Sequence, residues 1–264
     1  MTGPAQLRPG KVASLAFACL AALLVAFALP DFWVAVTQDP GRHRGADYNL
    51  YMSATRAWLG GGGFYLPHQL AGPYPIVMGD VLYPPLALWL FVPFTVLPTL
   101  LWWVIPIGVT GIALVLHRPT VVVWPLIALI LAWQPVEIHL ISGNPDIWAL
   151  AALAMATHVG GWAVFVLIKP TLAPFALWGV RRRSWLGCLA VVALASLLLA
   201  PMWPDWFTVL LNSQNPAGPL YAWQEAPLLL IPVIAWWGSA RRRDSGQPAA
   251  AEISRGLTAR APSS

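Results

Sequence analysis

Long apolar runs separated by proline rather than by charge most strongly constrain the fold of this chain. The first run, Val12 to Leu29, is long enough at about 1.5 Å of helical rise per residue to cross most of a hydrocarbon core of about 30 Å. Seven further runs follow: Leu82 to Leu97, Thr99 to Leu116, Thr120 to Trp133, Ile147 to Thr157, Trp162 to Val180, Trp185 to Ala200 and Leu220 to Ala240. Several are short, so we expect some of them to enter a bilayer partway and line a protein-walled cavity.

The composition excludes an ordinary soluble domain. The 264 residues are 58 % hydrophobic and 9 % charged, whereas a soluble domain is about a quarter charged. The sequence therefore predicts an all-α, polytopic transmembrane helical bundle with about eight apolar segments. We expect one integral membrane domain over residues 1–243 and a disordered cytoplasmic tail over 244–264, which has no apolar periodicity.

The basic residues indicate orientation rather than nucleic-acid binding. The net charge is +5, but the triplets Arg181 to Arg183 and Arg241 to Arg243 directly adjoin apolar runs, and Arg8 and Lys11 precede the first run. By the positive-inside rule these residues face the cytoplasm. We expect a multi-pass protein of the cell membrane with both termini cytoplasmic and no nucleic-acid partner.

Two polar segments are predicted on the opposite, outer face. Residues 31–81 form a large first outer loop, and residues 202–218 form the last outer loop. Within the first loop, Tyr48 to Leu59 has a helix-compatible composition and stops at the glycine run that begins at Gly60. This stretch is predicted to be a helix at the membrane interface.

Asp47, at the start of that helix, has two interpretations. As an N-cap, its side chain would satisfy an unpaired backbone N–H of the helix. As a general base, it would accept a proton from an attacking hydroxyl, with Arg42, Arg44 and Arg56 nearby to keep it ionised. The two roles are compatible.

Lys169 is the second unusual charge, because it lies inside the run Trp162 to Val180 and precedes Pro170. It is too far from either end of the run for its side chain, roughly 6 Å long, to reach the interface. We expect it to face the protein interior and to bind an anion, with a lipid-linked phosphate as a candidate.

The densest polar cluster between apolar runs is Glu137 to Asp146. Its Gly-Asn-Pro-Asp sequence is typical of a turn, and the cluster is alternatively the polar wall of a substrate cavity. No spacing in the chain matches a metal motif, so no metal and no cofactor are predicted. The residues predicted to line a substrate cavity are Tyr48, Tyr51, Tyr65, Tyr83, His139, Asn144, Asp146, Trp203 and Trp206.

The order of these residues resembles glycosyltransferase family 87. The resemblance covers about Val12 to Trp185 and is carried by Asp47 with Tyr51 and Ala54, Gly63 and Tyr65, Tyr83-Pro84-Pro85, Gly143-Asn144 with Asp146, and Lys169-Pro170 ahead of the arginine cluster. The chain departs from the family at Gly143-Asn144-Pro145-Asp146, where the family has Gly-Gln-x-Asn.

The resemblance implies a GT-C fold and a mannosyltransferase that uses polyprenyl-phosphate sugars. It implies that Asp47 is the base, acting on the outer face, and that the acceptor is an envelope lipid or glycan. Lys169, Arg42, Arg44 and Arg56 are the cations available for the donor phosphate. Because phosphate is a competent leaving group, these residues suffice for a single displacement with inversion. The alternative is a non-catalytic polytopic protein, either a transporter or a subunit of an envelope complex.

Overall fold

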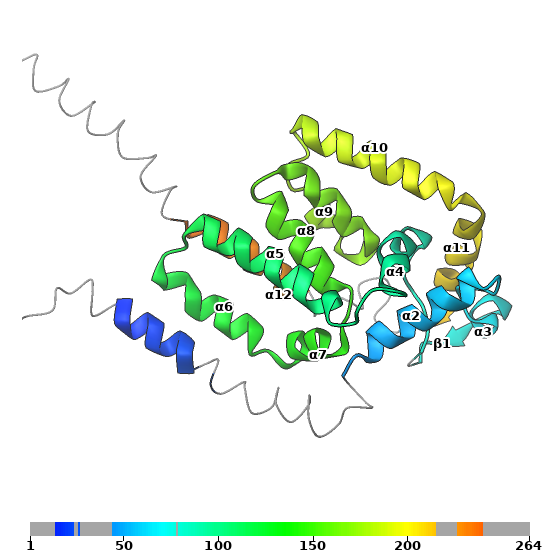
Figure 1. Ribbon diagram of the computed structural model, residues 1–264, viewed down its shortest axis with the longest axis horizontal. Helices are drawn as coiled ribbons and strands as arrows, with labels where there is room; N and C mark the ends of the chain where they lie inside the picture. The colour runs from blue at the N-terminus through cyan, green and yellow to red at the C-terminus, as the bar shows by residue number, and fades with distance from the viewer. Residues whose placement is uncertain (1–13, 24–25, 27–43, 78, 215–225, 240–264) are drawn as a thin grey trace, which may run out of the picture.

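The computed structural model describes residues 14–23, 26, 44–77, 79–214 and 226–239, most of which are helical (Figure 1). A first helix covers Ser14–Leu23. The following elements are α2 (Ala46–Leu59), α3 (Pro67–Ala71), β1 (Tyr74–Pro75), η1 (Pro85–Ala87), α4 (Leu88–Phe94), α5 (Leu101–His117), η2 (Val121–Val123), α6 (Trp124–Leu131), α7 (Gln134–Ser142), α8 (Asp146–Ala156), η3 (Gly160–Ile168), η4 (Pro170–Leu172), α9 (Ala173–Ala176), α10 (Arg183–Leu198), η5 (Ala200–Met202), α11 (Trp203–Asn212), β2 (Ser213–Gln214) and α12 (Ala226–Trp237).

The predicted all-α class is confirmed for the described residues. Their strands, β1 and β2, are two residues long and pair in parallel, with Tyr74 opposite Ser213. The predicted helix from Tyr48 to Leu59 is α2, which ends where Gly60 and Gly61 begin the glycine run. The predicted tail 244–264, residues 31–43 of the first loop and the triplet from Arg241 lie outside the described residues.

No single described helix is both long enough and apolar enough to cross a membrane. Two consecutive pairs meet those criteria together, and each pair is bent by 71°: Val121–Leu131 with Gln134–Ser142, and Arg183–Leu198 with Ala200–Asn212. The predicted runs Thr120 to Trp133 and Trp185 to Ala200 therefore each continue into a second helix beyond a sharp bend.

The apolar run from Trp162 to Val180 is broken at Lys169, directly before Pro170. The chain forms η3, is extended at Lys169 (φ −126°, ψ 94°), and resumes with η4 and α9. Pro170 explains the break, because proline disfavours a helical conformation in the residue before it. The segment is a hairpin, since a Cβ atom on Gly179 would lie only 2.6 Å from the Cα atom of Gly160. Lys169 lies near the middle of this hairpin.

Residues 202–218 were predicted to form an outer loop, but most of the described part of this segment is helix α11. Trp206 and Val209 are buried on one face of α11 and belong to a cluster that includes Tyr65 and Tyr74. Trp206 and Val209 are three positions apart and so lie on the same face of the helix, and their burial stabilises it. The tryptophan and proline content of the segment did not indicate a helix.

The turn between α7 and α8 fixes one end of α5 beside it. The indole N–H of Trp102 donates to the carbonyl of Gly143 at 2.8 Å, and that of Trp103 donates to the carbonyl of Leu140 at 2.7 Å. The other ends of α5 and α8 also meet, because His117 Nε2 lies 2.6 Å from Thr157 Oγ1. Helices α5 and α8 therefore run side by side in the same direction.

Basic residues gather where α5 and α8 end. Arg118 follows α5, and the residues Arg181 to Arg183 follow Gly179, which packs on Gly160 four positions after the end of α8. The C-terminal end of α12 is at the same place, because Thr120 N–H donates to the carbonyl of Gly238 at 3.0 Å. We call this region, defined by Arg118 and Arg181 to Arg183, the basic end; the α7–α8 turn lies at the opposite end of α8.

Candidate functional site

Asp47 lies in the first turn of α2, but it does not cap that helix. The N-cap residue is Gly45, in the left-handed region with φ 67°, and no side chain forms a capping hydrogen bond there. Gly45 N–H instead donates to the carbonyl of Ile141 at 2.9 Å, which fastens the start of α2 to α7. The N-cap interpretation of Asp47 is therefore wrong, and its side chain is directed elsewhere.

The half-buried carboxylate of Asp47 accepts two hydrogen bonds from the α7–α8 turn. Ser142 Oγ donates to Asp47 Oδ2 at 2.8 Å, and Asn144 Nδ2 donates to the same oxygen at 2.9 Å. Among the described residues, no hydrogen bond to Asp47 Oδ1 and no ion pair to Asp47 is found. Ser142 and Asn144 therefore both hold Oδ2 of this carboxylate.

Gly143 gives the turn its shape. Its φ of 74° lies in the left-handed region, which lets α7 end at Ser142 and α8 begin at Asp146. A Cβ atom at Gly143 would lie 2.6 Å from Trp103 Cζ2, so no larger residue fits without a shift. The predicted Gly-Asn-Pro-Asp turn is thus present, and it also presents polar groups to Asp47.

The side-chain oxygen of Asn144 is held from the other side. Tyr83 donates its hydroxyl hydrogen to Asn144 Oδ1 at 3.0 Å, and the backbone N–H of Asp146 donates to the same atom at 3.1 Å. All three residues are buried. The amide of Asn144 thereby connects α2 to the loop before η1 and to the start of α8.

Lys169 faces the interior as predicted, and its partner is a carboxylate of this chain. Its Nζ lies 2.9 Å from Asp146 Oδ1 and donates to Oδ2 at 3.1 Å. Asp146 is fully buried, Lys169 is 5 % exposed, and Lys169 Nζ lies 5.8 Å from the centre of the Tyr83 ring. His139 Nδ1 is 3.3 Å from Asp146 Oδ2.

We define the polar network as Asp47, Tyr83, Ser142, Asn144, Asp146 and Lys169, with His139 at its edge. Four segments that are distant in the sequence supply it: α2, the residues before η1, the stretch from α7 through the turn to the start of α8, and the tip of the Gly160–Gly179 hairpin. The sequence analysis predicted all of these residues except Ser142 as candidate site residues. The signal for Ser142 was its place two positions before Asn144, beside a turn glycine.

Two of the three arginines predicted to bind phosphate, Arg44 and Arg56, are described, and they lie near opposite ends of α2. Arg56 is nine positions after Asp47 on α2, which is about 13 Å of helix, and its Nη2 donates to the carbonyl of Thr95 at 3.1 Å. Arg44 is exposed and lies three positions before Asp47. Arg42 is outside the described residues. Arg44 is therefore the described arginine that stays near Asp47 in the chain.

The other predicted cavity residues are packing residues around the network. The Tyr48 hydroxyl donates to the carbonyl of Phe94 at 3.2 Å, and Tyr51 stacks on Phe91 with ring centres 5.1 Å apart. The indole of Trp203 donates to the carbonyl of Ser196 at 3.2 Å. Their predicted contact with substrate stays a prediction.

Tyr65 and Trp206 support the backbone on either side of Tyr83. The Tyr65 hydroxyl donates to the carbonyl of Tyr83 at 3.0 Å, and the Trp206 indole donates to the carbonyl of Leu82 at 3.0 Å. Burial, together with the negative charge of Asp205, raises the pKa of Tyr65 well above its ordinary value. Tyr65 is therefore a neutral donor that fixes the main chain at Tyr83.

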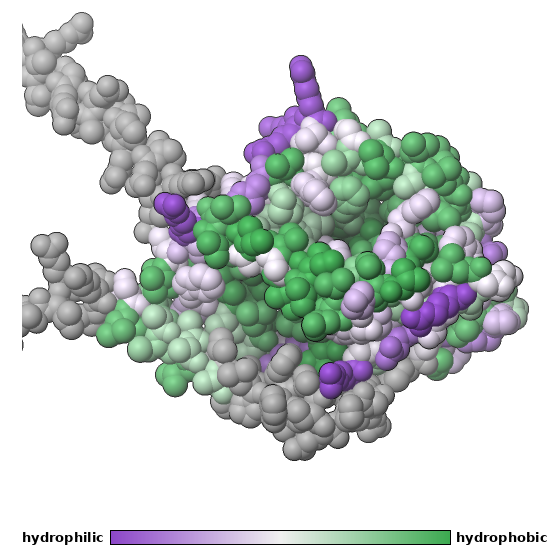
Figure 2. Space-filling view, viewed as in Figure 1, coloured by the Kyte–Doolittle hydropathy of each residue, from purple (hydrophilic) through white to green (hydrophobic). Residues whose placement is uncertain are grey.

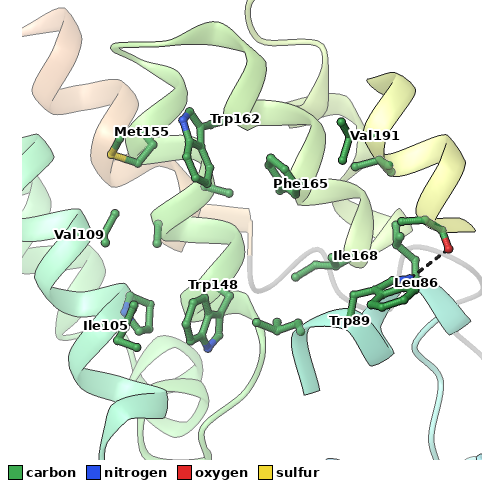
Figure 3. Close-up of a pocket in the computed structure, with 16 residues that line it drawn as sticks. Leu86, Trp89, Ile105, Val109, Trp148, Met155, Trp162, Phe165, Ile168 and Val191 are labelled. Atoms are coloured by element: carbon green, nitrogen blue, oxygen red, sulfur yellow. Dashed lines mark hydrogen bonds between the residues drawn. The ribbon is translucent and has the colours of Figure 1, made fainter. Parts of the chain in front are cut away.

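A cavity of about 520 Å³, which sequence reasoning did not locate, lies beside the network (Figure 3). All 16 lining residues are apolar or tryptophan, and Figure 3 shows Val109 of α5 on one side and Val191 of α10 on the other. The lining includes Leu86, Trp148 and Ile168, which are three, two and one positions from Tyr83, Asp146 and Lys169. Neither Asp47 nor Lys169 lines it.

Within the described ranges, no group of three or more His, Cys, Asp or Glu residues is arranged to hold a metal ion. Comparison of the chain with protein-family models, with curated proteins and with solved structures gives no match.

Proposed function

We propose that this chain is a membrane glycosyltransferase that moves a hexose, mannose in the first instance, from a polyprenyl-phosphate sugar to an envelope lipid or glycan. Asp47 acts as general base in a single displacement with inversion. Its Oδ1 accepts the proton of the acceptor hydroxyl as that oxygen attacks the anomeric carbon, and the bond from that carbon to the phosphate oxygen breaks. The polyprenyl phosphate leaves with the electron pair of that bond.

The observation that carries the proposal is the way in which Asp47 is held. Ser142 and Asn144 fix one oxygen of the carboxylate with neutral donors, and Lys169 is paired with Asp146. Asp47 thus forms no ion pair with a described residue. A fixed carboxylate with one unbonded oxygen is the arrangement that a general base requires.

The surface supports a membrane location. Large apolar side chains are exposed along one side of α5, where Ile112 is 63 % and Val115 is 74 % exposed, and along α10, where Leu194 is 61 % exposed. Figure 2 shows apolar residues spread widely over the visible face, with the most hydrophilic residues gathered in a few places. Contiguous apolar surface of this kind is costly in water and is expected against lipid.

The apolar cavity supports a lipid-linked donor. Its lining can accommodate part of an isoprenoid chain, while the neighbouring polar network would contact the polar head of the donor. The basic end lies at the far end of α8 from the α7–α8 turn, so a cytoplasmic basic end implies that Asp47 works on the outer face.

The proposal is tested by incubating membranes that contain the protein with radiolabelled polyprenyl-phosphate mannose, glucose and galactose in turn. We expect transfer of label into a lipid or glycan product from one of these donors, and the mannose donor is expected to be the best. Membranes from the same host without the protein are the control. Absence of protein-dependent transfer from every donor would contradict the proposal.

A transporter is the second candidate, and the buried charges favour it. Lys169, Asp146 and His139 form a compact group of ionisable side chains in an apolar setting, which is typical of proton relays in transporters. In that case, purified protein in proteoliposomes would carry a solute or protons across the bilayer, and Asp146→Asn would abolish that flux. A transferase would show sugar transfer in detergent, where no second compartment exists.

A further inference from the structure

We propose that Asn144 is a positioning residue whose amide holds the Asp47 carboxylate in its working orientation, with Tyr83 and the backbone of Asp146 fixing that amide. This inference rests on the proposed role of Asp47 as base. It assigns Asn144 and Tyr83, which the sequence placed in a substrate cavity, to holding the base rather than to binding the sugar.

The hydrogen-bond partners of Asn144 permit only one orientation of its amide. The backbone N–H of Asp146 can only donate, so the Asn144 atom 3.1 Å away must be the oxygen. The Nδ2 group then faces Asp47 and must donate to it, at 2.9 Å. A flipped amide would place a carbonyl oxygen against a carboxylate and two N–H donors against each other.

Tyr83 reinforces the same orientation from a different segment. Its hydroxyl donates to Asn144 Oδ1 at 3.0 Å, and Tyr65 holds the main chain of Tyr83 in place. Lys169 keeps Asp146 at the start of α8 by neutralising its buried carboxylate. The chain of contacts therefore runs from Lys169 through Asp146 and Asn144 to Asp47.

The variant Asn144→Asp tests this role with almost no change in shape. It replaces the neutral donor by a second carboxylate within hydrogen-bond distance of Asp47, and the two carboxylates repel when both are ionised. When the pair holds one proton, the hydrogen bond between them is restored. We therefore expect the ratio of variant to parent kcat to fall as the pH rises, by on the order of 10²-fold at alkaline pH, as for a misplaced catalytic group. The KM for the donor is expected to change little.

The exchange variant Asp47→Asn/Asn144→Asp separates holding from catalysis. The amide and the carboxylate trade places, so the hydrogen bond returns and the melting temperature is expected to recover toward the parent value. Sugar transfer from polyprenyl-phosphate mannose is not expected to recover, because the carboxylate is no longer at position 47. Asn49→Asp, on the exposed face of α2, is the matched control and should show a pH-independent ratio near one.

The outcomes distinguish failure of the positioning role of Asn144 from failure of the proposed function. If Asp47→Asn is inactive but Asn144→Asp matches the parent at every pH, the positioning role is overturned and the proposed function survives. If Asp47→Asn transfers sugar like the parent, both the proposed function and the positioning role are overturned. An exchange variant no more stable than Asn144→Asp would show that the Asp47–Asn144 pair is not a structural unit, which also overturns the inference.

Discussion

Lys169 and Asp146 form an ion pair that is almost completely withdrawn from solvent, with Lys169 Nζ 2.9 Å from Asp146 Oδ1. The pair joins the tip of the Gly160–Gly179 hairpin to the first residue of α8. Burial of either charge without the other is costly, so the pair holds two segments of the polar network together.

Lys169→Met is therefore expected to destabilise the protein by about 3 to 5 kcal/mol, because it leaves Asp146 buried without its cation. From the sequence alone, the same substitution would be expected to leave the fold nearly intact. Thermal unfolding in detergent measures the effect. The double variant Lys169→Met/Asp146→Leu should recover much of the loss, and a double variant no more stable than Lys169→Met would show that the pair is not the cause.

Gly143→Ala is expected to cost about 1 to 3 kcal/mol, because alanine is strained at φ 74° and its Cβ would press on the Trp103 ring. The shift of the turn should also lower sugar transfer. Gly108→Ala is the matched control, since Gly108 lies inside α5 and a Cβ there meets nothing within 4 Å. That control should be neutral or slightly stabilising. Equal stability losses in the two variants would contradict the account of the turn.

Ala195→Phe is expected to fill part of the apolar cavity, because Ala195 of α10 is among its lining residues. If an isoprenoid chain occupies the cavity, the variant should raise the KM for a long-chain polyprenyl-phosphate donor and leave that for a donor of two or three isoprene units unchanged. The matched control is Leu194→Phe, at an exposed neighbouring position. A rise in KM that is the same for both donors would contradict a lipid in the cavity.

Stability is expected to fall at alkaline pH in a way that depends on Tyr65. In the folded protein the pKa of Tyr65 is raised, mainly by burial, whereas the pKa of tyrosine in the unfolded chain is about 10. Above that pH the unfolded state binds fewer protons than the folded state, so the free energy of unfolding decreases as the pH rises. In Tyr65→Phe, the melting temperature should decrease less with pH than in the parent between about pH 9 and 11. Parallel curves of melting temperature against pH for parent and variant would contradict this.

The sequence predicted which residues are unusual better than it predicted how they meet. Asp47, Asn144, Asp146 and Lys169 stand out as polar groups in an apolar chain, and they share one network. Their pairing was not predictable, because a lysine and two carboxylates allow several partners. The role of Lys169 shows this, since the sequence assigned it to an external phosphate and the structure pairs it with Asp146.

The errors in the fold have a common physical origin. Proline content alone does not distinguish a kinked helix from a hairpin, so the sequence did not predict that the run around Pro170 turns back on itself. The stretch after Met202 was expected to be a loop, yet Trp206 and Val209 bury one face of α11 against a cluster formed largely by distant residues. Tertiary packing of this kind is not visible in a local window of sequence.

The most direct test of the central claim is the rate of sugar transfer by Asp47→Asn at equal membrane abundance. Asparagine retains an oxygen that can accept the hydrogen bonds of Ser142 and Asn144, so the fold should be kept while the proton acceptor is lost. Asp205→Asn, at an exposed carboxylate of α11, is the matched control and should transfer sugar like the parent. A general base predicts a rate lower by about 10² to 10⁴ for Asp47→Asn. Transfer within about threefold of the parent, well short of the loss expected of a base, would contradict the assignment of Asp47 as the catalytic residue.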